Sequence, residues 1–176
     1  MLLDIHLPDL FLAVLLLAAV LSDLTARLIP NLLIGVGLAF ALGWHFICSG
    51  VNGLIFSGQG LALGMLLLMV PFFLGGMGAG DVKLLGMVGA FVGADMVWDV
   101  FLWTALIGGA VSFLYLAASG RLLNTVKKVL LPLASTFLPR PYAVLSGGKD
   151  RTEPELYLPY GVIIALGTLA SYWKSW

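Results

Sequence analysis

The sequence predicts an all-α integral membrane protein, one bundle of six transmembrane helices that forms a single domain over residues 1–176. Composition supports this class, because 61% of the residues are hydrophobic and only 10% are charged, whereas a soluble domain carries far more polar surface. Mean hydropathy is +1.07. The chain also divides into apolar stretches that each approach the ~20 residues with which a helix crosses the hydrocarbon.

Turn residues set the limits of the expected helices. Pro30-Asn31 separates the first two, and residues 49–53 and 57–59, which are rich in Gly, Ser and Asn, separate the second from the third. Only the segment 95–99 divides the fourth from the fifth. We therefore expect membrane spans at about 8–27, 32–48, 60–75, 81–97, 99–118 and 157–173.

The distribution of Lys and Arg predicts the orientation of the bundle. The first, third and fifth connections hold eight of the nine basic residues, and positively charged connections stay in the cytoplasm. The other side has Lys174 as its one basic residue, together with the acids Asp4, Asp9, Asp95 and Asp99. We therefore expect both termini outside, with Asp23 and Asp81 at the cytoplasmic face.

The fifth connection, about 119–156, is the one long loop. At its start, apolar residues recur at helical spacing from Leu122 to Leu133, and polar residues such as Arg121 and Lys128 take the opposite face. This pattern predicts an amphipathic helix on the cytoplasmic membrane surface, attracted to anionic lipids. Such a helix serves either as a membrane-anchoring linker or as a dock for a substrate.

Composition excludes several classes of function. A single cysteine, Cys48, rules out a disulfide framework and a multi-cysteine zinc site. A formal net charge of +0 offers no basic field for nucleic acid. No Lys or Arg precedes the first apolar run, so we do not expect a cleaved signal peptide. His6, His45 and Cys48 lack partners at metal-ligand spacing, and we expect neither a metal nor a cofactor.

Asp23 falls near the cytoplasmic end of the first expected helix. Acidic residues at membrane depth are costly, rare and usually functional. Arg27 follows four residues later on the same helical face, so an ion pair that closes the helix is the alternative to a functional role. Pro30 ends the helix soon afterwards.

Asp81 follows the glycine-rich segment Gly75-Gly76-Met77-Gly78-Ala79-Gly80. Such a segment is a poor helix former, and irregular backbone at membrane depth is tolerated only where protein or a water-filled cavity surrounds it. Asp81 then opens the fourth expected helix, where the helix dipole favours an ionised carboxylate. An ordinary helix cap after a flexible loop is the alternative interpretation.

The two acids together suggest a specific chemistry. Two neighbouring carboxylates cannot both ionise easily, so one of them keeps a proton. The ionised group then activates water as a base, while the protonated group acts as an acid toward the carbonyl oxygen or the leaving nitrogen of an amide. Either aspartate can hold the shared proton, because the proton belongs to the coupled pair.

These residues resemble the type IV prepilin peptidases, which belong to the intramembrane aspartyl proteases with a Gly-x-Gly-Asp motif. The resemblance lies in Asp23-x-x-x-Arg27-x-Ile29-Pro30-Asn31, in Met77-Gly78-Ala79-Gly80-Asp81-Val82-Lys83-Leu84-Leu85 and in Pro159-Tyr160-Gly161. The short form is most similar to the enzymes of tight-adherence (Flp-type) pilus systems. The resemblance implies a protein of the bacterial inner membrane in which Asp23 and Asp81 cleave the basic leader from prepilins or pseudopilins before pilus assembly.

The larger, bifunctional members of this family carry an added cytoplasmic region with paired cysteines, and they also N-methylate the new terminus. This chain has neither the room nor the cysteines for that region. We therefore do not expect methyltransferase activity.

Several residues around the two acids are expected to support the site: Arg27, Pro30, Asn31, Gly78, Gly80, Lys83, Pro159, Tyr160 and Gly161. Lys83 is either an anchor at the membrane interface or a contact for the substrate or the acids. Pro159 is also an ordinary helix start, and Tyr160 is also a reasonable interface anchor. Gly89-x-x-x-Gly93 predicts close helix packing within the bundle rather than a dimer contact.

Two other functions are compatible with acids in a membrane bundle. A proton-coupled transporter predicts acids at the midplane, whereas Asp23 and Asp81 fall near one edge of their spans. A non-catalytic assembly scaffold predicts that both residues can become Asn without loss of function.

Overall fold

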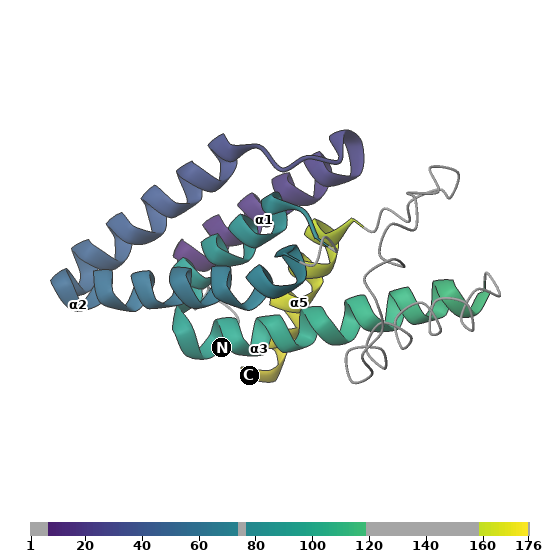
Figure 1. Ribbon diagram of the computed structural model, residues 1–176. Helices are drawn as coiled ribbons and strands as arrows, with labels where there is room; N and C mark the ends of the chain where they lie inside the picture. Colours follow the sequence, from purple (N-terminus) through teal and green to yellow (C-terminus); the bar gives the residue numbers. More distant parts are fainter. Residues whose placement is uncertain (1–6, 74–76, 119–158, 176) are drawn as a thin grey trace, which may run out of the picture. The chain divides into compact units, whose positions relative to one another are not determined.

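The protein is described by a computed structural model over residues 7–73, 77–118 and 159–175, which form four α-helices (Figure 1). Helix α1 spans Leu7–Ala26, α2 Asn31–Phe73, α3 Ala79–Ala118 and α5 Tyr160–Ser175. Among these residues, α1, α2 and the part of α3 up to Tyr115 are long and apolar enough to cross a membrane. The all-α class is confirmed, while the count of six spans stays a prediction. The predicted surface helix in 119–156 lies outside the described residues.

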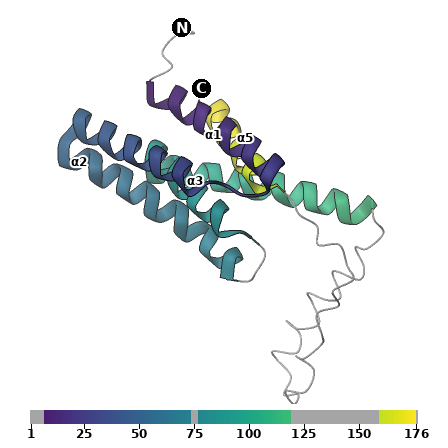
Figure 2. The same cartoon turned by 90° about the horizontal axis from the view of Figure 1, so that it is seen from above.

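Two glycines bend the long helices. Gly50 in α2 has φ 57° and ψ −136°, and Gly93 in α3 has φ 82° and ψ 175°. Both φ values lie in the left-handed region, which glycine enters without steric cost. Figures 1 and 2 both show α2 turning back alongside itself. In agreement with this turn, Gly53 lies against the backbone carbonyl of His45.

The connections between neighbouring spans differ from the prediction. The expected loop at 49–59 is helical from residue 51 onward, because Gly50 alone makes the turn. Residues 95–99 are helical as well, and the chain bends before them, at Gly93. A single residue with a left-handed φ therefore replaces each expected loop.

Glycines also bring the second segment of α2 against the first segment of α3. Gly60 and Gly89 approach so closely that a Cβ on either would meet the backbone carbonyl of the other. Gly64 lies in the same way against Leu85, and Gly93 lies against the ring of Phe56. The predicted close packing of Gly89 and Gly93 is therefore found inside the chain, as small-residue interfaces allow.

Side chains of α2 bond to the carbonyls that precede the bend in α3. Ser57 Oγ donates to the Ala90 carbonyl at 2.8 Å, and His45 Nε2 bonds to the Phe91 carbonyl at 3.1 Å. Both carbonyls lie within one turn of Gly93, where the regular hydrogen-bond ladder is interrupted. Unsatisfied backbone groups are costly inside a membrane, so these two bonds stabilise the bend.

Helix α1 has one buried and one exposed stripe. The exposed stripe runs through Leu10, Leu17 and Leu24, whose side chains are 57–61% exposed. The buried stripe contacts α2 and α5 and consists of Leu12, Leu15, Leu16, Ala19 and Asp23. An exposed apolar face is expected where lipid surrounds the helix. Asp23 therefore continues the buried stripe of α1 toward the interior of the bundle.

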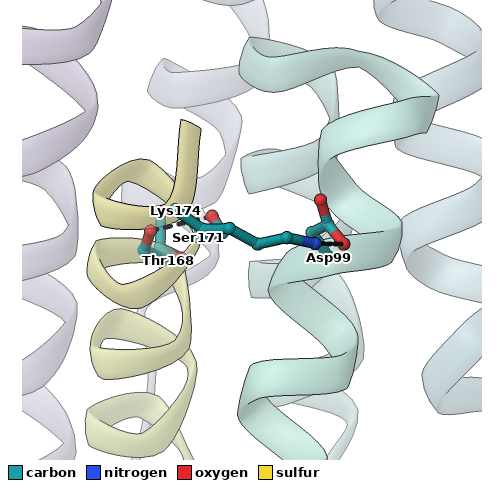
Figure 3. Close-up of polar contacts among 4 residues, drawn as sticks. All are labelled: Asp99, Thr168, Ser171 and Lys174. Atoms are coloured by element: carbon teal, nitrogen blue, oxygen red, sulfur yellow. Dashed lines mark hydrogen bonds and ion pairs between the residues drawn. The ribbon is translucent and has the colours of Figure 1, made fainter. Parts of the chain in front are cut away.

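Polar contacts fasten the C-terminal end of α5. Lys174 Nζ reaches Asp99 Oδ1 on α3 at 3.2 Å, and Ser171 Oγ donates to the Thr168 carbonyl (Figure 3). The Tyr172 hydroxyl donates to Asp9 Oδ1 at the start of α1, at 2.7 Å. Asp9, Asp99 and Lys174, which the charge distribution assigns to the outer side, therefore meet at the same end of α5.

Candidate active site

Asp23 is placed by the last turn of α1 and is only 2% exposed. Its Oδ2 accepts a hydrogen bond of 2.9 Å from the backbone N–H of Gly161, which lies in the first turn of α5 and is itself buried. The two residues are separated by 138 positions in the chain. The fold thus brings the Pro159-Tyr160-Gly161 motif directly onto the first acidic residue.

The chain turns sharply after Asp23. Arg27 has a positive φ of 53°, and its N–H donates to the Asp23 carbonyl at 3.0 Å. Ser22 Oγ donates to the Leu28 carbonyl at 2.7 Å and closes the same turn. Because α1 ends at Ala26, Arg27 lies beyond the helix rather than on its face as predicted.

This turn packs onto the second motif. The side chain of Ile29 is buried, at 6% exposure, and it is the nearest neighbour of Gly80, where an added Cβ would lie 3.5 Å from Ile29 Cβ. Pro30 is exposed, and its carbonyl accepts the N–H groups of Leu33 and Ile34 at the start of α2. The first two motifs therefore meet where the Ile29 side chain packs against Gly80.

Asp81 lies in the first turn of α3 and is partly buried. Its Oδ2 accepts from the Gly78 N–H at 3.2 Å, while its own N–H donates to the Gly78 carbonyl at 3.2 Å. Gly78 precedes the helix, so Asp81 reaches back to the cap residue in the manner of a capping box. One oxygen of Asp81 therefore does take part in a helix cap. The cap position itself belongs to Gly78 and not to Asp81.

The structure brings the two aspartates together, since the carboxylates of Asp23 and Asp81 are close enough to interact electrostatically. Asp23 comes from the end of α1 and Asp81 from the start of α3. Two carboxylates in this relation favour a state in which one is ionised and the other protonated. Such a pair offers one base and one acid at a single place.

Lys83 and Asn31 form a second link between the motifs. Lys83 Nζ donates to Asn31 Oδ1 at 2.9 Å, and both side chains are exposed. The bond joins the fifth residue of α3 to the first residue of α2. The sequence placed both residues near the site but gave no signal that they contact each other.

The third motif begins α5 as predicted. Pro159 precedes the helix, and its carbonyl accepts the Val162 N–H at 3.1 Å. Tyr160 is partly buried, and its ring lies near Gly108 of α3. The bond from Gly161 to Asp23 is the contact that sequence reasoning missed, because a backbone donor leaves no mark in the side-chain pattern.

Within the residues that the structure describes, no group of three or more His, Cys, Asp or Glu side chains is placed to hold a metal ion. That the reaction needs neither a metal nor a cofactor stays a prediction.

The fold and the site define a class of protein: a helical membrane protein with a pair of interacting carboxylates where two of its helices meet. The profile of the type IV leader peptidase family matches residues 10–113, and the chain belongs to this family. The resemblance to prepilin peptidases is thereby confirmed. The matched range includes both Asp23 and Asp81 and ends before α5. Comparisons with curated proteins and with solved structures gave no match.

Proposed function

We propose that this chain is an intramembrane aspartyl endopeptidase that removes the basic leader from prepilin-like proteins, with Asp23 and Asp81 as its catalytic residues. Membership of the type IV leader peptidase family supports a leader peptidase in general. The observation that carries the aspartyl mechanism is that the two carboxylates, which come from different helices, lie close enough to interact electrostatically.

The proposed reaction needs only water and this pair. The ionised carboxylate takes a proton from water as the water oxygen attacks the scissile carbonyl carbon. The protonated carboxyl donates its proton to the carbonyl oxygen. As the tetrahedral intermediate collapses and the C–N bond breaks, the protonated group gives its proton to the leaving nitrogen. The ionised group takes a proton from a hydroxyl of the intermediate, so the pair again has one ionised and one protonated group.

The proposed substrate is a membrane helix with a basic leader. Helical amides are shielded by their own hydrogen bonds, so the scissile segment must unwind beside the pair. The backbone at Gly78 supports such an approach, because among the described residues a Cβ added there would meet only atoms of Gly80 and Asp81 within 4 Å. Small residues therefore leave room beside Asp81 for an extended chain.

The remaining details are part of the same proposal. The protein sits in the bacterial inner membrane with its active site toward the cytoplasm and both termini outside, it serves a Flp-type pilus system, and it lacks methyltransferase activity. Two observations support a one-sided active site. Contacts join the turn after α1 to the starts of α3 and α5, while Asp9, Asp99 and Lys174 meet at the opposite end of α5.

The direct experiment is incubation of the purified protein, in lipid, with a candidate prepilin, followed by mass spectrometry of the products. We expect one cut that releases the basic leader, also in the presence of a chelator. Intact substrates across a panel of prepilins, together with proton flux through proteoliposomes, would favour a transporter. Cleavage that a chelator abolishes and zinc restores would contradict the aspartyl mechanism.

A further inference from the structure

We propose that Gly161 is a positioning residue of the active site, whose backbone N–H holds the Asp23 carboxylate in place and fixes its direction. This inference rests on the proposed function, because it concerns how one member of the catalytic pair is held. It assigns α5 a part in the reaction even though α5 contributes no side chain to the pair.

Asp23 needs such a partner for two reasons. Its residue is only 2% exposed, so little water is available to stabilise a negative charge. It also lies in the last turn of α1, where the helix dipole presents its negative end and disfavours an anion. A carboxylate at this place therefore depends on a directed hydrogen-bond donor.

The start of α5 supplies the opposite field. Gly161 is the second residue of this helix, and the first N–H groups of a helix have no acceptor within it. The Gly161 N–H instead donates to Asp23 Oδ2 at 2.9 Å, at the positive end of the α5 dipole. A hydrogen bond of this kind restricts the orientation of the carboxylate.

The absence of a side chain at this position has a local cause. Left-handed φ values among the described glycines occur at Gly50 and Gly93, so the backbone conformation at Gly161 does not call for glycine. A Cβ at Gly161 would instead lie 2.9 Å from Asp23 Oδ2, 3.2 Å from its Cβ and 3.3 Å from its Cγ. All three nearest atoms belong to Asp23, so any larger residue would displace this carboxylate first.

The rest of α5 is fixed independently of this bond. The Tyr172 hydroxyl donates to Asp9 at 2.7 Å, which ties the far end of α5 to the start of α1. Buried Ile164 and Thr168 lie on the same helix between these two contacts. Removal of the Gly161 donor should therefore leave the helix in its place.

The test is replacement of the amide at residue 161 by an ester, through semisynthesis of the full-length protein. The ester replaces the Gly161 N–H by an oxygen and adds no side chain. It removes no donor that bonds within α5 and only weakens the Tyr160 carbonyl as an acceptor. We expect kcat for leader removal to fall about ten- to a hundredfold with KM little changed, because the lost hydrogen bond acts on the pair and not on substrate binding. An ester variant with unchanged kcat would overturn the inference.

Alanine variants provide matched controls. Gly161→Ala should lower kcat at least as strongly as the ester does. Gly167→Ala, on the same helix, would press against Thr104 rather than Asp23, and Gly43→Ala has no neighbour within 4 Å. Gly43→Ala should retain kcat, and Gly167→Ala should lower stability without the kcat loss of the ester. An equal kcat loss in Gly167→Ala would assign a general packing role to Gly161.

The outcome is separable from a failure of the proposed function. If Asp23→Asn and Asp81→Asn still cleave, the catalytic assignment itself is wrong. If these two variants are inactive and the ester variant retains full kcat, only the role of Gly161 is refuted. If the Gly161→Ala protein does not fold, the kcat of the ester variant decides the test, because the ester adds no side chain.

Discussion

At the scale of single residues, the site depends on backbone groups as much as on side chains. Asp23 accepts from the Gly161 N–H, and Asp81 accepts from the Gly78 N–H. Each carboxylate is thus held through one oxygen by a peptide group at the start of a helix. These two bonds fix the direction of carboxyl groups that would repel each other if both were ionised.

The first prediction concerns the bond between Lys83 and Asn31. Lys83→Met and Asn31→Ala should each lower the free energy of unfolding by about 0.5–1 kcal/mol, because each removes one exposed hydrogen bond to a charged group. The double variant should cost no more than either single variant, since both remove the same bond. Denaturation of the four proteins in detergent measures this coupling, and fully additive losses would show that the two residues act separately.

The sequence points to Asp23 and Asp81 but not to the groups that hold them. Asp23 and Asp81 stand out because acids are expensive at membrane depth, and the motif around Pro159 points to the same site by resemblance. The contacts of Gly161 with Asp23 and of Lys83 with Asn31 join positions 138 and 52 residues apart. No local pattern encodes such pairs, because they arise only once the helices pack.

At the scale of helices, two left-handed glycines and a glycine contact shape α2 and α3. Gly50 and Gly93 bend the helices, while Gly60 and Gly89 let the two backbones touch. The bend at Gly93 interrupts backbone hydrogen bonding near Ala90, and α2 supplies the missing donors from the side. The close packing of α2 on α3 therefore also supplies the hydrogen bonds that stabilise the bend at Gly93.

Ser57 provides the second prediction. Ser57→Ala should destabilise the protein by about 1–2 kcal/mol, because it leaves the buried Ala90 carbonyl without the donor that lies at 2.8 Å. Ser49→Ala, at an exposed position of the same helix, should have almost no effect. Thermal unfolding in detergent compares the two variants, and equal stability would show that the bond contributes nothing to the bend.

The third prediction compares alanine substitutions that should change the free energy of unfolding in opposite directions. Gly60→Ala and Gly89→Ala should each cost about 1–3 kcal/mol, because the new Cβ meets a backbone carbonyl across the interface. Gly43→Ala meets nothing within 4 Å and should stabilise α2 by about 0.5–1 kcal/mol through helix propensity. The same unfolding measurement applies. A stabilised Gly60→Ala protein would refute this account of the interface.

The helices themselves were largely predictable, and their junctions were not. Apolar length predicts the helical segments, because a membrane requires them. The Gly and Ser residues within 49–59 predict a loop, whereas the structure turns at Gly50 and continues as a helix. Single glycines with a left-handed φ look the same in sequence as the glycines that serve close packing, such as Gly60 and Gly89.

For the whole molecule, the contacts form two groups at opposite ends of α5. The turn after α1 and the starts of α3 and α5 come together around Asp23 and Asp81, and the basic residues Arg27 and Lys83 belong to this group. Asp9, Asp99 and Lys174 meet at the other end of α5. That the end with Asp23 and Asp81 faces the cytoplasm stays a prediction from the basic residues.

The fourth prediction tests that orientation by cysteine labelling in a Cys48→Ser background. Asn52→Cys, exposed just after the bend in α2, should react with an impermeant reagent added to intact cells. Gly148→Cys, in the long fifth connection, should react only after the membrane is opened. Labelling of position 148 from outside would contradict the assignment of both aspartates to the cytoplasmic face.

The central claim is that Asp23 and Asp81 act as one catalytic unit. Asparagine keeps the size of either residue and can still accept the bonds from Gly161 and Gly78, but it cannot exchange a proton. It also removes the repulsion between two buried acids, so thermal stability should stay level or rise. Asp95→Asn and Asp99→Asn, which change acids outside the pair, are the matched controls.

The most direct measurement is the rate of leader removal from a co-expressed prepilin by these four variants, beside their thermal stability in detergent. We expect Asp23→Asn and Asp81→Asn each to lose at least about a thousandfold in rate, because removal of either group disables both the base and the acid. Asp95→Asn and Asp99→Asn should cleave normally. Near-normal cleavage by a well-folded Asp23→Asn or Asp81→Asn protein would contradict the account.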